Sequence, residues 1–325
     1  MNYKILVTGS AGFIGSHLVE ELVRQGYNVR AFVRYNARND WGWLQAVPCL
    51  KNIEIYTGDI RDYDSVRNAA CGVEVIFHLA ALIGIPYSYI SPLAYIKTNV
   101  EGTYNILQAA REEEVQRVVH TSTSEVYGMA RYVPIDEEHP LQAQSPYAAS
   151  KIAADQLALS FHRSFGLPVV VVRPFNTFGP RQSARAVIPT ILTQVLAGAR
   201  VIRLGNLAPT RDFNFVRDTV SGLLAVGLSD LAVGQVVNIG GGKEISIGDL
   251  VELIRRITGS EFAVEQEEAR VRPEGSEVER LVCDNRRAKE LAGWSPRYTL
   301  EEGLWETIQW FRENLYLYKP DLYNV

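Results

Sequence analysis

Tyr147 and Lys151 have the residue types and the spacing that proton transfer requires. On a helix, residues four apart lie on one face one turn apart, so the ammonium of Lys151 is expected beside the phenol of Tyr147. A nearby positive charge lowers the pKa of a phenol from about 10 toward neutral pH, which makes it a usable general base. Ser145-Pro146 is typical of a helix N-terminus, with a capping side chain followed by proline. The alternative is an exposed tyrosine and a solvated lysine, because this spacing also occurs by chance.

The sequence TSTSEVYG at residues 121–128 adds hydroxyl groups and a carboxylate to this candidate site. The apolar run Arg117–Ser122 predicts a strand, so the polar residues follow directly after its carboxyl end. Ligands of open parallel sheets bind at that edge. The predicted catalytic residues are Thr123, Ser124, Glu125, Tyr147 and Lys151.

The sequence GSAGFIG at residues 9–15 lies between an apolar strand, Lys4–Thr8, and an amphipathic helix. Gly9 permits a tight turn, Gly12 lets the backbone approach a pyrophosphate, and Gly15 lets helix and sheet pack closely. The helix N-terminus then faces the phosphates. The spacing is GxxGxxG, and its strand-turn-helix context predicts binding of a dinucleotide.

The second strand, Asn28–Val33, ends without the acidic residue that normally accepts a hydrogen bond from the adenosine ribose. Arg34 follows instead. It is either a partner for the 2′-phosphate of NADP or a solvated arginine, so NAD and NADP both stay open. Asn99 either ties its helix to the sheet or touches the cofactor. The predicted cofactor contacts are Gly9, Gly12, Phe13, Ile14, Gly15, Arg34, Asp59, Ile60, Leu79, Ala80, Ala81, Asn99, Tyr147, Lys151 and Pro174.

Strands alternating with helical patterns predict an α/β fold, a Rossmann-type doubly wound parallel sheet with a smaller C-terminal α/β substrate lobe. We expect a dinucleotide-binding domain over residues 1–180, to which about 212–240 return, and a second, ligand-binding domain over 181–325. His78 is expected to be a packed core histidine. Trp41 and Trp43 lie in a polar connection and either pack on the core or cover a ligand. A buried stripe is expected along the helix at 92–112, through Leu93, Ile96, Val100, Tyr104, Leu107 and Ala110.

Composition excludes several classes of partner. The chain has 325 residues, a net charge of −4 and no basic block, so nucleic acid and anionic membranes are not expected to bind. Its three cysteines, Cys49, Cys71 and Cys283, are far apart, which predicts reduced thiols and a cytoplasmic location. We expect no metal site, no export signal and no transmembrane helix, because the sequence has no metal-ligand spacing and no apolar run of the length that spans a membrane.

The segments GSAGFIG, HTSTSEVYG, SPYAASK and RPFNTFGPR together resemble the extended short-chain dehydrogenases/reductases that modify nucleotide sugars, over essentially the whole chain. More narrowly, NDWGWL, IGIPYSYISP, GPRQSARAVIPTI and YKPDLYNV are similar to the NDP-N-acetylglucosamine 4,6-dehydratases of legionaminic acid biosynthesis. The resemblance implies a tightly bound, recycled NAD or NADP and a homodimer built on the helices near 92–112 and 146–165. It also implies substrate contacts from Asn176, Arg181, Val187, Arg211 and Arg272.

The same resemblance implies a reaction. Tyr147 takes the proton of the sugar 4-hydroxyl as C4 is oxidised, Glu125 takes the C5 proton, water leaves from C6, and the hydride returns to C6. Glucose-type dehydratases carry Asp-Glu after the threonine, whereas this chain has Ser124-Glu125. Whether Glu125 is both base and acid therefore stays open, as do UDP against GDP and dimer against tetramer.

Three alternatives to this reaction remain. A UDP-glucuronate decarboxylase uses the same 4-ketone, and a UDP-hexose 4-epimerase usually has a small residue where Glu125 stands. A cofactor-sensing binding protein is the alternative of a different class.

Overall fold

The predicted apolar strands form one sheet of seven parallel strands in the computed structural model, which describes residues 3–323. The strand order is β11-β6-β5-β4-β1-β2-β3, so the order reverses between β1 and β4. Ligands bind outside the carboxyl ends of the strands at such a switch point. The predicted Rossmann-type doubly wound sheet is confirmed. The strands are β1 Lys4–Thr8, β2 Asn28–Arg34, β3 Ile53–Gly58, β4 Val75–His78, β5 Arg117–Thr121, β6 Val169–Pro174 and β11 Val236–Ile239.

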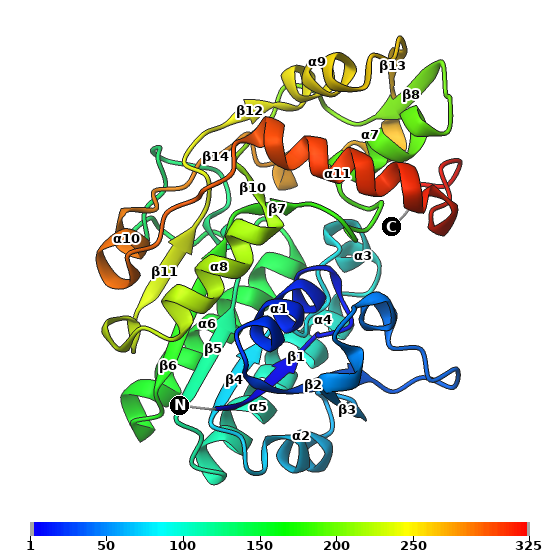
Figure 1. The fold of residues 1–325 in the computed structure, drawn as a ribbon. Coiled ribbons are helices and arrows are strands. Elements are labelled where there is room, and N and C mark those ends of the chain that lie inside the picture. The colour runs from blue at the N-terminus through cyan, green and yellow to red at the C-terminus, as the bar shows by residue number, and fades with distance from the viewer. Residues whose placement is uncertain (1–2, 324–325) are drawn as a thin grey trace.

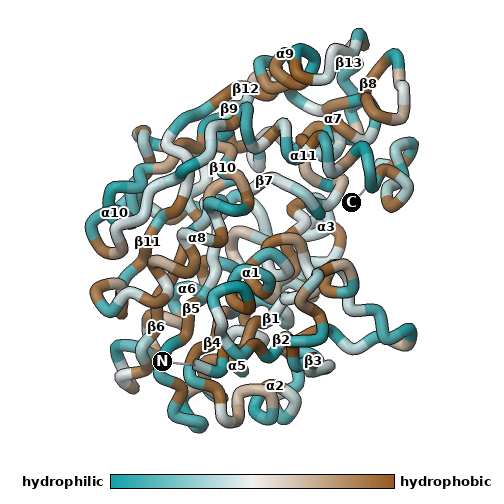
Figure 2. Tube along the Cα trace, in the orientation of Figure 1, coloured by the Kyte–Doolittle hydropathy of each residue, from teal (hydrophilic) through white to brown (hydrophobic). Residues whose placement is uncertain are grey.

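Helices cover both faces of this sheet. Ile5 and Val7 of β1 belong to a core cluster shared with helices α1 and α8, whereas Leu6 belongs to a second cluster on the opposite face. This alternation follows from the two-residue period of a strand. Figure 1 shows α1 and α8 in front of the sheet, and Figure 2 shows hydrophobic residues along its strands. The helices are α1 Phe13–Arg24 and α8 Val216–Gly227 on one face, and α2 Tyr63–Ala70, α5 Gly102–Glu112 and α6 Pro146–Phe165 on the other.

Helix α6 begins and ends where its sequence predicts. The Ser145 hydroxyl accepts a hydrogen bond from the Ala148 amide at 3.1 Å, and Pro146 occupies the first helical position. Gly166 ends the helix in a left-handed conformation, φ 71°, which glycine adopts without steric cost. These caps place Tyr147 and Lys151 in the first two turns, at the carboxyl edge of the sheet.

The C-terminal half adds a smaller α/β lobe above this edge (Figure 1). Its small sheets have the strand orders β10-β7, β12-β9-β14 and β13-β8. The chain re-enters the main sheet as β11, which pairs with β6. The lobe contains β7 Asn176–Phe178, β8 Val201–Leu204, β9 Thr210–Arg211, β10 Phe213–Phe215, β12 Ile245–Ser246, β13 Ala263–Gln266, β14 Arg280–Leu281, and helices α7 Val187–Leu196, α9 Ile247–Thr258 and α11 Leu300–Asn314. Helix α10 Arg286–Ala292 packs instead against α8 and β11.

The prediction of a buried stripe along residues 92–112 is wrong for three of its six residues, which are exposed. The segment is α4 Pro92–Tyr95, a π-helical turn Ile96–Glu101, and α5. A π turn holds an extra residue, so the faces before and after it no longer align. Leu107 and Ala110 are buried, whereas Leu93, Ile96 and Tyr104 are 60%, 53% and 45% exposed. These exposed residues form an apolar surface on the helix.

The tryptophan loop after β2 contributes to both the core and a cavity. Trp41 packs against the main core cluster, whereas Trp43 lines the large cleft described below and contacts Trp310 of α11 edge-to-face, with ring centroids 5.5 Å apart. The Trp43 amide donates to the Ala11 carbonyl at 3.1 Å, which fixes this loop beside the glycine turn.

Candidate active site

A cleft of about 1550 Å³ lies between the carboxyl edge of the main sheet and the C-terminal lobe. It is larger than the ~300–1,000 Å³ of a typical small-molecule site, and so has room for a dinucleotide together with a second ligand. Every predicted site residue except Asn99 lines this cleft.

The glycine turn fits the pyrophosphate of a dinucleotide. Gly9 has φ 69°, and a Cβ there would lie 2.8 Å from the Ala80 amide nitrogen. A Cβ on Gly15 would lie 2.2 Å from the Gly9 carbonyl oxygen. Gly12 is the N-cap of α1 and provides no side-chain cap, and the first turn contains no acidic residue. The amide groups of that turn are therefore free to bind an anion at the cleft.

His78 and Asn99 support the cavity wall from behind. His78 is 2% exposed and shares hydrogen bonds with Thr8, at 2.8 Å, and with Thr103, at 3.1 Å, as expected of a core histidine. Asn99 is 1% exposed; its side chain accepts from the Leu82 amide and donates to the Leu82 carbonyl and the Ser150 hydroxyl. These hydrogen bonds hold the backbone of Leu82, which lines the cleft. Of the two roles left open for Asn99, they therefore favour structural support.

Tyr147 and Lys151 both line the cleft, but the expected effect on the pKa is wrong. Burial raises the pKa of Tyr147, and a hydrogen bond with Thr123 offsets only part of this. The Lys151 ammonium is directed at the Thr121 carbonyl oxygen, 2.8 Å away, and burial lowers its own pKa to about 8. Helical spacing places both side chains on the cleft, but burial is the largest cause of the pKa shift of each.

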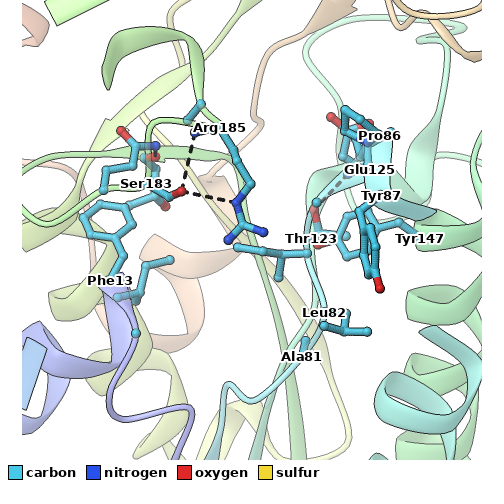
Figure 3. A pocket seen from close by; sticks show the side chains of 18 of the residues that line it. Phe13, Ala81, Leu82, Pro86, Tyr87, Thr123, Glu125, Tyr147, Ser183 and Arg185 are labelled. Atoms are coloured by element: carbon cyan, nitrogen blue, oxygen red, sulfur yellow. Dashed lines mark hydrogen bonds between the residues drawn. The ribbon is translucent and has the colours of Figure 1, made fainter. Parts of the chain in front are cut away.

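The TSTSEVYG segment forms the turn that carries the predicted carboxylate. Thr123 caps a 3₁₀ turn, Ser124–Tyr127, and its hydroxyl accepts from the Glu125 amide at 3.3 Å. The Glu125 side chain is 12% exposed, and its Oε2 lies 3.9 Å from Nη1 of Arg272. Figure 3 shows Thr123, Glu125 and Tyr147 along one wall of the cavity. A phenol and a carboxylate therefore face the same space.

Residues of the C-terminal lobe contribute cations and an amide to the same cleft. Arg211 is 7% exposed, donates to the Thr210 carbonyl at 2.8 Å and lies 3.4 Å from Glu277. Burial lowers the pKa of Arg211. Within residues 3–323, Oδ1 of Asn176 and Nη1 of Arg272 are buried without a hydrogen-bond partner. Both residues line the cleft, so these two atoms can form hydrogen bonds with a polar ligand there.

The two remaining predicted substrate residues differ from each other. Arg181 is already paired, because its Nη1 lies 2.5 Å from Glu20 of α1. Val187 begins α7, whose N-cap provides no side-chain hydrogen bond. Val187 and Ile188 at this helix start line the cleft, and their backbone amides precede the hydrogen-bonded part of the helix, so they are suited to an anion such as a diphosphate.

Several residues that line the same cavity are not among the predicted site residues. Tyr87 stands beside Glu125 and Tyr147, and Ser183 and Arg185 stand across from them (Figure 3). The Arg185 Nε donates to the Ser183 hydroxyl at 3.2 Å. The run of aromatic residues in IGIPYSYISP was a signal for the first of these, whereas Arg185 was one arginine among many.

These features define a class of protein. A dinucleotide-binding Rossmann sheet whose β5 edge carries Thr123 and whose next helix carries Tyr147 and Lys151 is the arrangement of a short-chain dehydrogenase/reductase. In the described part of the chain we find neither a cluster of three or more potential metal ligands nor a helix long and apolar enough to cross a membrane.

Comparison with known proteins agrees with this class. A profile described as GDP-mannose 4,6 dehydratase matches residues 6–307. A dTDP-glucose 4,6-dehydratase of Streptomyces niveus is 35% identical, covering 98% of this chain and 95% of its own. A putative UDP-glucose 4-epimerase of Methanocaldococcus jannaschii is 33% identical, covering 95% of this chain and 99% of its own. A UDP-N-acetyl-α-D-glucosaminuronate decarboxylase of Bacillus cytotoxicus is 34% identical, covering 96% of this chain and 99% of its own.

Among solved structures, DesIV of Streptomyces venezuelae, a dTDP-glucose 4,6-dehydratase with NAD bound, superposes with a TM-score of 0.87 at 32% identity, covering 98% of this chain and 99% of its own. This chain therefore belongs to the GDP-mannose 4,6-dehydratase family of extended short-chain dehydrogenases/reductases, enzymes that modify nucleotide sugars and include epimerases and decarboxylases.

Proposed function

We propose that this protein is an NAD-dependent 4,6-dehydratase that converts UDP- or GDP-N-acetylglucosamine to its 4-keto-6-deoxy product, as in legionaminic acid biosynthesis. The observation that carries the proposal is the position of Glu125, a carboxylate on the same wall of the cleft as Tyr147. An epimerase needs only the base, whereas elimination of water needs a second group for the C5 proton.

Residues of the cofactor half would hold NAD in this proposal. The turn from Gly9 to Gly15 binds the pyrophosphate, and the wall at Leu79–Ala81 permits a close approach of the nicotinamide ribose. A bound nicotinamide supplies the hydride acceptor for C4 and later the hydride donor for C6. NADP stays open because Arg34 is exposed and lines the cleft near Asp59.

The chain's own groups perform the proton transfers. Tyr147 removes the proton of the 4-hydroxyl, with the Lys151 ammonium and Thr123 stabilising the phenolate. The 4-ketone that results acidifies the C5 hydrogen, which Glu125 removes. Ser124, 3% exposed beside it, donates a hydrogen bond to the 6-hydroxyl, and the proton held by Glu125 passes to that oxygen, which leaves as water. A proton from solvent then adds to C5 as C6 regains the hydride. Burial raises the pKa of Tyr147, so the phenol depends on these neighbouring groups to act as a base.

Five residues would bind the nucleotide sugar: Asn176, Arg181, Val187, Arg211 and Arg272. The oxygen of Asn176 and the Nη1 of Arg272, which lack a hydrogen-bond partner, support a contact with a diphosphate or the sugar, as do the buried Arg211 and the start of α7. We assign 1–180, with 212–240, to cofactor binding and 181–325 to the nucleotide sugar.

We also propose a cytoplasmic homodimer built on residues 92–112 and 146–165. Its support is the apolar surface formed by Leu93, Ile96 and Tyr104, which Phe165, 50% exposed, continues on α6. Exposed apolar patches of this kind mark protein interfaces. The three free cysteines support a reducing compartment.

The deciding experiment is mass spectrometry of products formed from UDP- and GDP-N-acetylglucosamine, with dTDP-glucose and UDP-glucuronate as comparisons. We expect loss of water from an N-acetylglucosamine nucleotide. Water loss from dTDP-glucose alone would show that dTDP-glucose, and not an N-acetylglucosamine nucleotide, is the substrate. Loss of carbon dioxide from UDP-glucuronate would indicate a decarboxylase. An unchanged mass with inversion at C4, detected by NMR, would indicate an epimerase.

A further inference from the structure

A third polar residue follows Tyr147 and Lys151 along the same face of α6. Asp155 lies one turn beyond Lys151 and is completely buried. Residues four apart on a helix are neighbours, with Cβ atoms about 5–6 Å apart. The reaction described above does not use this carboxylate, and burial of an ionised group requires compensating partners.

An arginine pairs with the Asp155 carboxylate, and a histidine lies beside it. Its Oδ1 lies 3.2 Å from Nε2 of His120 on β5, and its Oδ2 accepts from Nε of Arg173 on β6 at 3.1 Å. Arg173 in turn donates to the Tyr127 hydroxyl at 3.0 Å, and Tyr127 donates to Asn238 at 2.7 Å. The carboxylate therefore cannot turn away from α6 without breaking a buried network.

Strand β5 also connects Asp155 with Lys151, because both side chains contact it. The Lys151 ammonium donates to the carbonyl of Thr121, and the residue before Thr121 is the His120 that contacts Asp155. Lys151 and Asp155 on α6 thus lie against two successive residues of β5. Lys151 is 4% exposed, so its charge depends on nearby groups more than on water.

Other titratable groups around Lys151 do not favour its charge. Burial lowers the pKa of both His78 on β4 and His120 on β5, so these imidazoles are neutral at pH 7. Tyr147 stays a neutral phenol because burial raises its pKa, and Arg173 on β6 is positive. Glu125 is directed toward Arg272. Asp155 is the anion that raises the pKa of Lys151 against burial.

We propose that Asp155 is a positioning residue, whose buried carboxylate keeps Lys151 charged and directed at the Thr121 carbonyl beside Tyr147. The effect of Asp155 on turnover rests on the proposed oxidation of the sugar at C4. Its effect on the charge of Lys151 is independent of the proposed function. A purely structural role is a weak explanation, because buried ion pairs contribute little net stability compared with apolar packing.

The charge of Lys151 can be tested without any substrate, by measuring melting temperature against pH. The folded-state pKa of Lys151, about 8, lies below its ordinary value of 10.5, so the charged lysine destabilises the fold at low pH and this cost is relieved as pH rises through that window. Asp155→Asn lowers the folded-state pKa further. We therefore expect the variant's loss of melting temperature to be larger at about pH 6.5 than at about pH 9.5.

Repeating the comparison in a Lys151→Met background isolates the lysine. There the loss caused by Asp155→Asn should be the same at both pH values. Equal losses at both pH values with Lys151 present, or the same pH dependence in the Lys151→Met background, would overturn the proposal. If Asp155→Asn does not fold because Arg173 is left unpaired, the double variant D155N/R173Q removes both charges and provides the same comparison.

The second readout is the pH profile of cofactor reduction by the nucleotide sugar. In Asp155→Asn we expect near-wild-type reduction at low pH and a roughly tenfold loss per pH unit above the lowered pKa of Lys151. Asp218→Asn is the matched control, because Asp218 is also buried and accepts hydrogen bonds from the Arg297 and Tyr298 amides. A parallel pH profile in Asp155→Asn would refute the role in turnover. A wild type that never reduces its cofactor would refute the proposed function alone, since the melting data would still report on Lys151.

Discussion

Glu125→Gln separates the oxidation step from the elimination step. The amide preserves the shape of the side chain but cannot take the C5 proton. At 3.9 Å and an effective dielectric constant of about 20, the gross attraction between Glu125 and Arg272 is about 4 kcal/mol before desolvation is subtracted. This is below the ~5–15 kcal/mol stability of a typical domain, so the variant should still fold.

The kinetic effect should fall on one step. Oxidation at C4 requires Tyr147 and not the carboxylate, whereas loss of a positioned general base typically slows proton transfer by ~10²–10⁴-fold, or about 3–5 kcal/mol of activation free energy. Reduced nicotinamide should therefore accumulate in a single turnover. Little 4-keto-6-deoxy sugar should form, and little deuterium should enter C5 in heavy water.

Stopped-flow absorbance of the reduced nicotinamide, with NMR of the product, measures both steps. Glu244→Gln is the control, because Glu244 is also partly buried and paired with an arginine, Arg280, but does not line the cleft. Product formation by Glu125→Gln at the rate of the control would refute the assignment of Glu125 as the C5 base.

Three further predictions concern the phenol, the cofactor and the interface. Tyr147→Phe should lower turnover by ~10²–10⁴-fold and leave NAD bound, as measured by steady-state kinetics and cofactor content; wild-type turnover would remove Tyr147 from the mechanism. Arg34→Ala should weaken NADP more than NAD in binding titrations, because only NADP carries the 2′-phosphate; equal losses would leave Arg34 as a surface charge. Leu93→Glu should convert the dimer to monomers in sedimentation, whereas Leu231→Glu, at an exposed site off these helices, should not.

The elements that position the site follow from local sequence. Ser145-Pro146 and Gly166 define α6 at both ends, and the apolar runs give strands β1 and β5 at their observed positions. Each of these signals acts over a few residues, through backbone geometry or a side-chain cap. Parallel strands then bring their carboxyl ends to one edge, which is why the residues after β1, β4 and β5 meet in one cleft.

The energetics of the same residues could not be obtained from spacing. The four-residue interval places Tyr147 beside Lys151, but the pKa of Tyr147 depends on burial against Tyr95 and Ile85, which follow β4 far away in the sequence. Likewise, a helical repeat at 92–112 identified an apolar pattern, but a π-helical turn decided which residues face water. The first error arises because spacing does not show what packs against a helix, and the second because the π turn changes the helical period itself.

The residues from the C-terminal lobe show a different limit. Asn176, Arg211 and Arg272 come from β7, β9 and a loop before β14, and no interval in the sequence relates them. They meet because β7 follows directly from the end of β6, and β9 pairs with β14. Resemblance to a family predicted these residues, whereas local pattern did not. Arg185, which resemblance also left out, faces the same space as Tyr147 from the loop before α7 (Figure 3). The proposed reactive groups thus lie on the main sheet and α6, and the proposed substrate contacts lie on the lobe above it, so relatives that share the first can differ in substrate through the second.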